Sequence, residues 1–201
     1  MKYKKDTSNI ILNAAFIEFE EKGYNGARMQ SIANRAGINK ALLHYYYKSK
    51  DAMFQIIINK AFHLLMPEII SVFEEDTDFF TTIEKFVFKY INILINNPYI
   101  PGFVTQEINN NPKRLLNLVK SPGINLNPVK EKIAKAVKDG IIEDINPNQL
   151  IINIMSLSIF PFIGRPLIEG VLLNGDKDKF DQLIEQRKEE VSKFIIKAIK
   201  K

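Results

Sequence analysis

A glycine between two short helical segments is the feature that most restricts the fold of this chain. Residues 31–47 read SIANRAGINKALLHYYY. Gly37 permits the left-handed backbone conformation of a tight turn. Ala33 is small where the two helices would cross, and Ile38 and Leu43 can fill the space between them. The spacing therefore predicts a helix-turn-helix unit.

Helical periodicity extends over the whole chain, because apolar residues recur at three- and four-residue spacing while strand signals stay weak. Gly23 is expected to end the first helix, and Asn39 and Ser49 are expected to cap the third and the fourth. We therefore predict an all-α fold. The expected helices cover about residues 6–22, 29–36, 40–47, 49–65, 78–96, 102–109, 113–119, 127–139, 148–164 and 176–200.

The charge of the chain is concentrated at one end. Residues 1–50 hold nine Lys or Arg against four acids, which accounts for the whole net charge of +5, and the rest is balanced. A basic segment attached to a neutral domain is typical of a protein that binds a polyanion through the basic segment. The alternative is an excess of lysines on a solvated surface. With 201 residues, two domains are feasible, and we place them at 1–50 and 51–201.

The absence of cysteine excludes disulfides, thiolate zinc sites and a cysteine nucleophile. The basic start of the chain is followed by polar residues 6–9, where a signal peptide would need an apolar stretch. We therefore expect a cytoplasmic protein. The only histidines are His44 and His63. Neither has a metal-ligand cluster beside it, so we expect no metal and no cofactor.

The second helix of the predicted helix-turn-helix carries side chains suited to a DNA groove. Lys40 brings charge, Leu42 apolar reach, and His44 and Tyr45 bring rings that hydrogen-bond, with Ala41 between them. Successive helical residues point about 100° apart, so the three tyrosines cannot share one face. We expect Tyr47 in the core and Tyr45 outward, whereas the direction of Tyr46 stays open. Lys48 and Lys50 follow the helix, near where phosphates would run.

The N-terminal quarter of the chain resembles the TetR family of tetracycline-repressor-like regulators. The resemblance covers residues 11–54, through ILNAAFIEFEEKGY and GARMQSIANRAGINKALLHYYYKSKDAMF. It implies a three-helix DNA-binding domain followed by a helical dimerisation and ligand-binding domain. It also implies phosphate or base contacts by Arg28, Asn39, Lys40, Leu42, His44, Tyr45, Tyr46 and Lys50, with Ala41 as a further base contact.

Three positions depart from the family pattern. Glu18 stands where the family has an apolar residue, and we expect it to loosen local packing. Ala27 and Arg28 replace a pair of hydroxyl residues before the second helix, which exchanges a capping hydroxyl for a guanidinium suited to phosphate. His44 replaces a tyrosine and offers a different group to a base edge, so the operator preference stays open.

Two C-terminal helices are candidates for a dimer interface. Residues 148–164 are apolar around nearly the whole circumference and lack charge, which favours burial against a partner chain. A membrane span is the competing interpretation, but the run is short and interrupted by polar residues. The last helix has an apolar stripe that could equally pack within one chain. The resemblance implies a four-helix interface, for which we select Ile152, Met155, Ile159, Phe180, Leu183, Ile184, Val191 and Phe194.

The middle of the chain is rich in aromatic residues that could line a ligand pocket. Ordinary aromatic core is the alternative for each of them. The resemblance implies a small apolar or amphipathic effector there. The selected pocket residues are Phe73, Phe86, Tyr90, Phe103, Gln106, Glu107 and Phe160.

No catalytic constellation stands out, since the sequence has no phosphate-binding glycine loop and no nucleophile with a base. We therefore do not expect an enzyme. The predicted function is a homodimeric transcriptional regulator, a repressor released from an inverted-repeat operator on double-stranded DNA by a small effector. The alternative is a helical ligand-binding dimer that has lost DNA binding.

Overall fold

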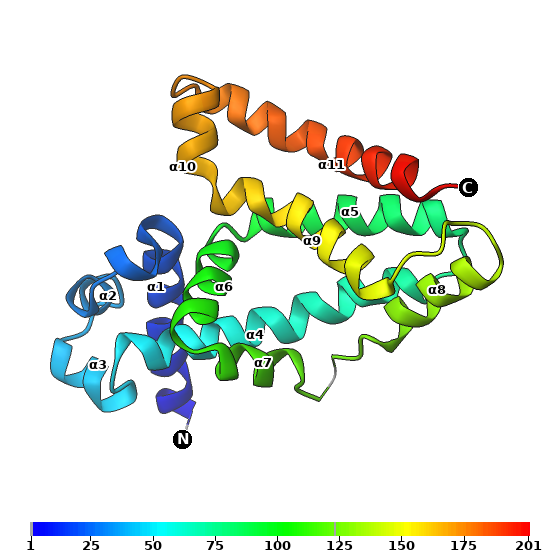
Figure 1. Cartoon of the computed structure of the whole chain (residues 1–201). Coiled ribbons are helices and arrows are strands. Elements are labelled where there is room, and N and C mark those ends of the chain that lie inside the picture. Colours follow the sequence, from blue (N-terminus) through cyan, green and yellow to red (C-terminus); the bar gives the residue numbers. More distant parts are fainter. Residues whose placement is uncertain (1, 123) are drawn as a thin grey trace. The chain divides into compact units, whose positions relative to one another are not determined.

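The computed structural model describes residues 2–122 and 124–201, and its elements are helices (Figure 1). Within these residues the one β-type contact is an isolated antiparallel bridge between Ile142 and Lys200. The predicted all-α fold is confirmed. The helices are α1 Lys2–Gly26, α2 Met29–Arg35, α3 Lys40–Tyr46, α4 Lys50–Ile70, η1 Ser71–Phe73, α5 Phe79–Asn96, α6 Tyr99–Asn110, α7 Pro112–Val119, α8 Asn127–Lys138, α9 Pro147–Ile163, α10 Arg165–Leu167, η2 Ile168–Leu172 and α11 Lys177–Ile199.

The chain divides into two compact units. The first contains the residues up to Leu64 together with Asn97–Val119, and the second contains Leu65–Asn96 and Lys120–Lys201. This division differs from the predicted boundary at residue 50. Helices α6 and α7 join the N-terminal helices, and α4 runs out of the first unit into the second as one continuous helix.

An aromatic cluster forms the core of the first unit. The rings of Phe19 on α1 and Phe54 on α4 lie 4.8 Å apart, and Phe54 lies 5.5 Å from Phe103 on α6. All three side chains are buried. Edge-to-face pairs of this kind add to the free energy gained from burial alone. The cluster therefore ties α1, α4 and α6 together.

The glycine signals lie where the helices break. Gly23 has φ 64° and ψ 176°, which interrupts α1 and leaves a short turn up to Gly26. Gly37 has φ 67° in the turn after α2. The expected end of α4 near residue 65 is wrong, because the helix continues through Pro67 to Ile70. A proline inside a helix removes one backbone hydrogen bond, and here the helix tolerates that loss.

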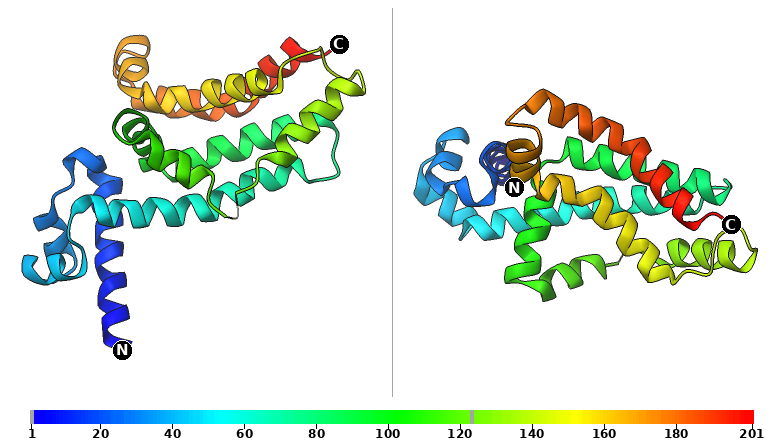
Figure 2. Two further views of the ribbon diagram at one scale, coloured as in Figure 1. Left: turned by 60° about the horizontal axis from the view of Figure 1, so that its bottom comes forward. Right: turned by 45° about the horizontal axis from the view of Figure 1, so that its top comes forward.

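Helix α11 packs along α5 and α9 in the second unit (Figure 2). Its inward stripe, Phe180, Ile184, Val191 and Ile195, is buried. A polar contact joins α11 to α9 as well, because Arg187 Nη2 donates to the carbonyl oxygen of Leu157 at 2.6 Å. Helices α5, α9 and α11 therefore form the framework of this unit.

The segment after α9 is helical, although no helix was predicted between residues 164 and 176. Arg165–Leu167 form a short α-turn, and Ile168–Leu172 continue as a π-helical turn. Pro166 lies in the first turn of α10, where a proline costs little because its missing N–H would be unpaired there anyway. The segment presents exposed Leu167, Val171 and Leu172.

One stretch of the described residues, Lys50–Phe73, is long and apolar enough to cross a membrane by itself. Helix α9 meets the same criterion only when it is joined to the following segment across a bend of 63°. Core helices of water-soluble proteins also meet it. In α4 the apolar side chains Met53, Phe54 and Ile58 are already buried within the protein.

Candidate nucleic-acid interface

Helices α2 and α3 form the predicted helix-turn-helix. The turn is closed by two backbone bonds, from Gly37 N to Asn34 O at 3.1 Å and from Ile38 N to Ala33 O at 3.0 Å. Ala33 and Leu43 are fully buried between the helices. The small side chain of Ala33 allows the two helices to approach closely.

Asn39 is the N-cap of α3, as expected. Its side-chain oxygen accepts a hydrogen bond from Leu42 N at 2.8 Å. This bond satisfies one of the N–H groups that every helix leaves unpaired at its start. The contact of Asn39 with DNA stays a prediction. Asn39 would have to make it while its side-chain oxygen still accepts the hydrogen bond from Leu42 N.

One side of α3 is exposed and the other is buried. Lys40, Ala41, Leu42, His44 and Tyr45 are exposed, Tyr45 by 68%. Tyr47 is buried, and its hydroxyl lies 2.6 Å from Ser8 Oγ on α1. The predictions for Tyr45 and Tyr47 are thus confirmed. Tyr46 is half-buried, with its ring 5.5 Å from that of Tyr45.

Glu18, which we expected to loosen local packing, is buried and paired with a cation. Its carboxylate is 1% exposed and accepts a hydrogen bond from Lys22 Nζ at 2.8 Å. The Arg28 backbone N–H and the Ser31 hydroxyl at the start of α2 lie near enough to help lower the pKa of the Glu18 carboxyl. The Arg28 side chain makes no capping bond. The start of α2 therefore has no side-chain cap from its own N-cap residue, and the buried Glu18 carboxylate lies close to it.

Hydrogen bonding decides the ionisation of Glu18. Burial by itself raises the pKa of Glu18, but the bonds from Lys22, Ser31 and the Arg28 backbone outweigh it and leave the pKa below the ordinary 4.5. A carboxylate held in this way stabilises the fold above its unfolded-state pKa. That stabilisation is lost as the pH falls through the lower pKa of the folded state.

Glu18→Gln is expected to lower the free energy of unfolding by about 1–3 kcal/mol at pH 7. The amide NH2 group of the glutamine is itself a donor, so it would face the hydrogen-bond donors that now surround the carboxylate. The difference between wild type and variant should be complete at pH 7 and should close below about pH 4.5. Denaturant unfolding across this pH range measures it. Glu21→Gln, which breaks an exposed ion pair with Arg35, is the control and should cost less than about 1 kcal/mol. A pH-independent difference for Glu18→Gln would contradict the account.

Lys50 is turned toward the protein's own backbone. Its Nζ donates to Tyr24 O at 2.7 Å and to Ala27 O at 3.1 Å, and it lies 4.4 Å from the centre of the Tyr24 ring. Burial lowers the pKa of Lys50. These hydrogen bonds join the start of α4 to the turn before α2. A phosphate contact by Lys50 stays a prediction. Exposed Arg28 and Lys48 lie at the two ends of the motif.

The structure distributes the predicted pocket residues over both units. Phe103, Gln106 and Glu107 lie on α6 in the first unit, and the others lie in the second. There the buried rings of Phe73, Phe86 and Tyr90 follow one another, with centroids 5.2 Å and 5.8 Å apart. Burial raises the pKa of Tyr90. Phe160 is instead 59% exposed, and Glu107 is paired with Arg114.

Three of the predicted dimer residues face the interior of their own chain. Phe180, Ile184 and Val191 are already buried within the protomer, and their assignment to a dimer interface stays a prediction. Ile152 and Phe194 are exposed as expected, and Met155, Ile159 and Leu183 are half-buried. The sequence analysis missed other exposed apolar side chains near them: Ile163, Leu167, Val171 and Leu172.

Comparison with known proteins agrees with this geometry. The profile of the family described as bacterial regulatory proteins, tetR family, matches residues 11–57, which span α2, α3 and the adjoining parts of α1 and α4. The transcriptional regulator RutR of Escherichia coli K12 is 25% identical over 191 residues, covering 94% of this chain and 89% of its own length.

Two further similarities extend the comparison. IcaR of Staphylococcus epidermidis, a negative transcriptional regulator of the biofilm operon icaADBC, is 26% identical over 110 residues, or 55% of this chain and 57% of its own length. A crystal structure of a TetR-family regulator from Mesorhizobium loti has a TM-score of 0.64 at 15% identity and covers 98% of both chains. Its likeness concerns the fold alone. Both of these relatives are named as transcriptional regulators. Residues 11–57 of the chain therefore carry the DNA-binding region of the TetR family of transcriptional regulators.

Proposed function

We propose that this regulator is a homodimeric repressor that reads an inverted-repeat operator with α3 and is released from it by a small effector. The observation that carries the proposal is the exposed face of α3, where Lys40, His44 and Tyr45 project from a helix whose opposite side is buried. A helix presented in this way fits the major groove of DNA. The naming of IcaR as a negative regulator supports repression.

The side chains of α3 divide into base readers and backbone contacts. Lys40 and His44 offer hydrogen-bonding groups to base edges, and Leu42 and Ala41 offer apolar contact to a thymine methyl group. Arg28 at the start of α2 and Lys48 after α3 supply positive charge for phosphates on either side. Tyr45 combines a ring with a hydroxyl, and Tyr46 beside it is a further contact.

The second copy of the chain is expected to cover the exposed apolar side chains of the second unit. Ile152, Phe160 and Ile163 on α9 and Phe194 on α11 would be in contact with water in a monomer. Apolar patches of this kind on soluble proteins mark interaction sites. A two-fold dimer also presents two recognition helices to half-sites about 34–36 Å apart, which a single short helix cannot do. Leu167, Val171 and Leu172 are further exposed apolar side chains of this unit.

The effector is a small apolar or amphipathic molecule. The aromatic side chains Phe73, Phe86 and Tyr90 in the second unit are the candidate contacts. Helix α4 starts four residues after α3 and ends next to η1, which contains Phe73. It therefore connects the recognition helix with the candidate contacts. The effector must bind one of two states more tightly, because equal affinity would shift nothing.

Selection from a pool of random DNA duplexes tests the DNA-reading part. Purified protein is mixed with the pool at two salt concentrations, and the retained duplexes are sequenced. We expect an inverted repeat with half-sites about one helical turn apart, bound less tightly at the higher salt concentration. Retention without any shared sequence would contradict sequence-specific binding. Failure to retain DNA at either salt would favour the helical ligand-binding dimer. Such a regulator acts on the genome, so we place it in the cytoplasm.

A further inference from the structure

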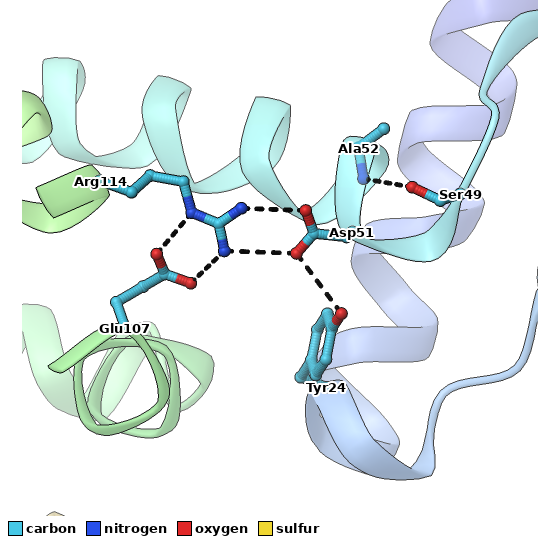
Figure 3. A network of polar contacts seen from close by, with 6 residues as sticks. All are labelled: Tyr24, Ser49, Asp51, Ala52, Glu107 and Arg114. Carbon is cyan, nitrogen blue, oxygen red and sulfur yellow. Dashed lines mark hydrogen bonds and ion pairs between the residues drawn. The ribbon is translucent and has the colours of Figure 1, made fainter. Parts of the chain in front are cut away.

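Four side chains from four helices meet in one polar network of the first unit (Figure 3). Arg114 on α7 donates from Nε to Glu107 Oε2 at 2.6 Å and from Nη2 to the other Glu107 oxygen. Its two terminal nitrogens also reach the Asp51 carboxylate on α4, at 2.9 Å and 3.3 Å. The Tyr24 hydroxyl near the end of α1 donates to Asp51 at 3.5 Å.

The two carboxylates around Arg114 differ in their access to water. Glu107 is fully buried, so its charge depends on the guanidinium. Asp51 is 43% exposed, so water can solvate its carboxylate when the ion pair with Arg114 opens. The hydrogen bonds that Arg114 donates to Glu107 and to Asp51 raise the pKa of Arg114. The Arg114–Glu107 ion pair therefore stays closed in the folded protein. The Arg114–Asp51 ion pair can open at a low cost in free energy.

The Arg114–Asp51 ion pair lies close to α3, the helix that we propose reads the DNA. Asp51 lies in the first turn of α4. It follows Tyr47, the C-cap residue of α3, by four positions. Ser49 caps the same turn through Ala52 N at 3.1 Å. On the other side, α6 packs against α1, and the rings of Phe16 and Tyr99 lie 5.2 Å apart. Helices α6 and α7 are thus anchored to the same unit that carries α2 and α3.

We propose that Arg114 is a positioning residue for DNA binding, although it lies outside the helix-turn-helix and contacts no base. Through Asp51 it holds the first turn of α4, and therefore α3, in the arrangement that reads the operator. Opening of the Arg114–Asp51 pair loosens α3 and lowers operator affinity. This inference rests on the proposed DNA-binding function and adds the residues through which α6 and α7 regulate it.

A planar guanidinium is required for this role. Arg114 presents one edge to Glu107 and another to Asp51 at the same time, and each edge makes two hydrogen bonds. A lysine carries one point charge and could not hold both carboxylates in fixed directions. Arg114→Lys therefore keeps the charge near Glu107 while it releases Asp51.

Asp51→Asn and Arg114→Lys test the proposal, with Lys85→Gln as the control. The control breaks an exposed 2.6 Å ion pair with Glu75 in the second unit. Hydrogen exchange is measured over residues 40–57 by mass spectrometry, and operator affinity is measured on a duplex obtained by the selection described above. Circular dichroism verifies that each variant is folded. The double variant Asp51→Asn/Arg114→Lys completes a mutant cycle.

We expect both single variants to accelerate exchange in residues 40–57 at least about fivefold and to weaken operator binding by about the same factor. The double variant should resemble the singles, because one contact is lost in all three. Removing a negative charge at residue 51 would by itself strengthen phosphate attraction, so the predicted sign separates positioning from simple electrostatics.

Unchanged exchange in both variants would overturn the proposal, and so would exchange that rises only in Asp51→Asn, because that would be a local effect on α4. Operator affinity that stays constant or rises while exchange increases would also overturn it. If wild-type protein selects no operator, the proposed function fails separately, while the exchange measurement still decides whether Arg114 holds α3.

Discussion

Replacing Lys40 and Tyr45 together with alanine is expected to weaken operator binding by about 100-fold or more. Both side chains project from the exposed face of α3, and each contact of this kind is worth about 1–3 kcal/mol. The proposed dimer would lose each contact twice. Fluorescence anisotropy on the selected duplex measures the change.

Stability should not change in this variant, because both positions are exposed and lie outside the core. Lys138→Ala on α8 removes the same charge from an exposed position of the second unit and is the matched control. It should bind the operator like wild type. An affinity within about threefold of wild type for Lys40→Ala/Tyr45→Ala would show that α3 is not the reading element, since even one lost contact of about 1.4 kcal/mol gives a factor of ten.

Phe160→Glu combined with Phe194→Glu is expected to convert the proposed dimer into a monomer. The two rings are 59% and 64% exposed on α9 and α11, and a second copy would bury them. Four glutamates in one interface would have to be desolvated without partners, which costs several kcal/mol. Sedimentation measures the mass. Operator affinity should fall by about 100-fold or more, because a monomer reads one half-site.

The control for this variant is Leu116→Glu on α7, an exposed apolar residue of the first unit. It introduces the same charge away from α9 and α11 and should leave the dimer intact. A Phe160→Glu/Phe194→Glu protein that is folded and still dimeric would show that the interface lies elsewhere. Wild-type protein that sediments as a monomer at micromolar concentration would contradict the homodimer directly.

Local signals explain why the helix ends were predictable. Gly23 and Gly37 adopt the positive φ that their neighbours could not adopt cheaply. Asn39 and Ser49 accept hydrogen bonds at the helix starts that they were expected to cap. Each of these effects depends on a few consecutive residues. Sequence alone therefore suffices to identify them.

The orientation of long apolar helices could not be predicted in the same way. Phe180 and Phe194 both belong to the apolar side of α11, yet Phe180 packs inside the protomer and Phe194 is exposed. Helical periodicity places both on one broad face. Which part of that face turns inward depends on α5 and α9, and no local pattern records it.

Contacts between distant segments were the least predictable. Asp51 and Arg114 are 63 residues apart, and each looks like an ordinary surface charge in the sequence. Glu18 gave a weak signal, since Lys22 follows it at i+4 and no hydroxyl residue caps α2. Considered together, these two features would have predicted a buried, satisfied carboxylate instead of loosened packing.

A footprint of the purified protein on the DNA around its own gene tests the central claim most directly. The account predicts a protected inverted repeat whose two halves lie about one helical turn apart, with protection that weakens steeply as salt increases. Lys40→Ala/Tyr45→Ala should abolish this protection at the same protein concentration. Protection of a single asymmetric half-site would contradict the two-fold dimer, and protection that persists in the double variant would contradict DNA reading by α3.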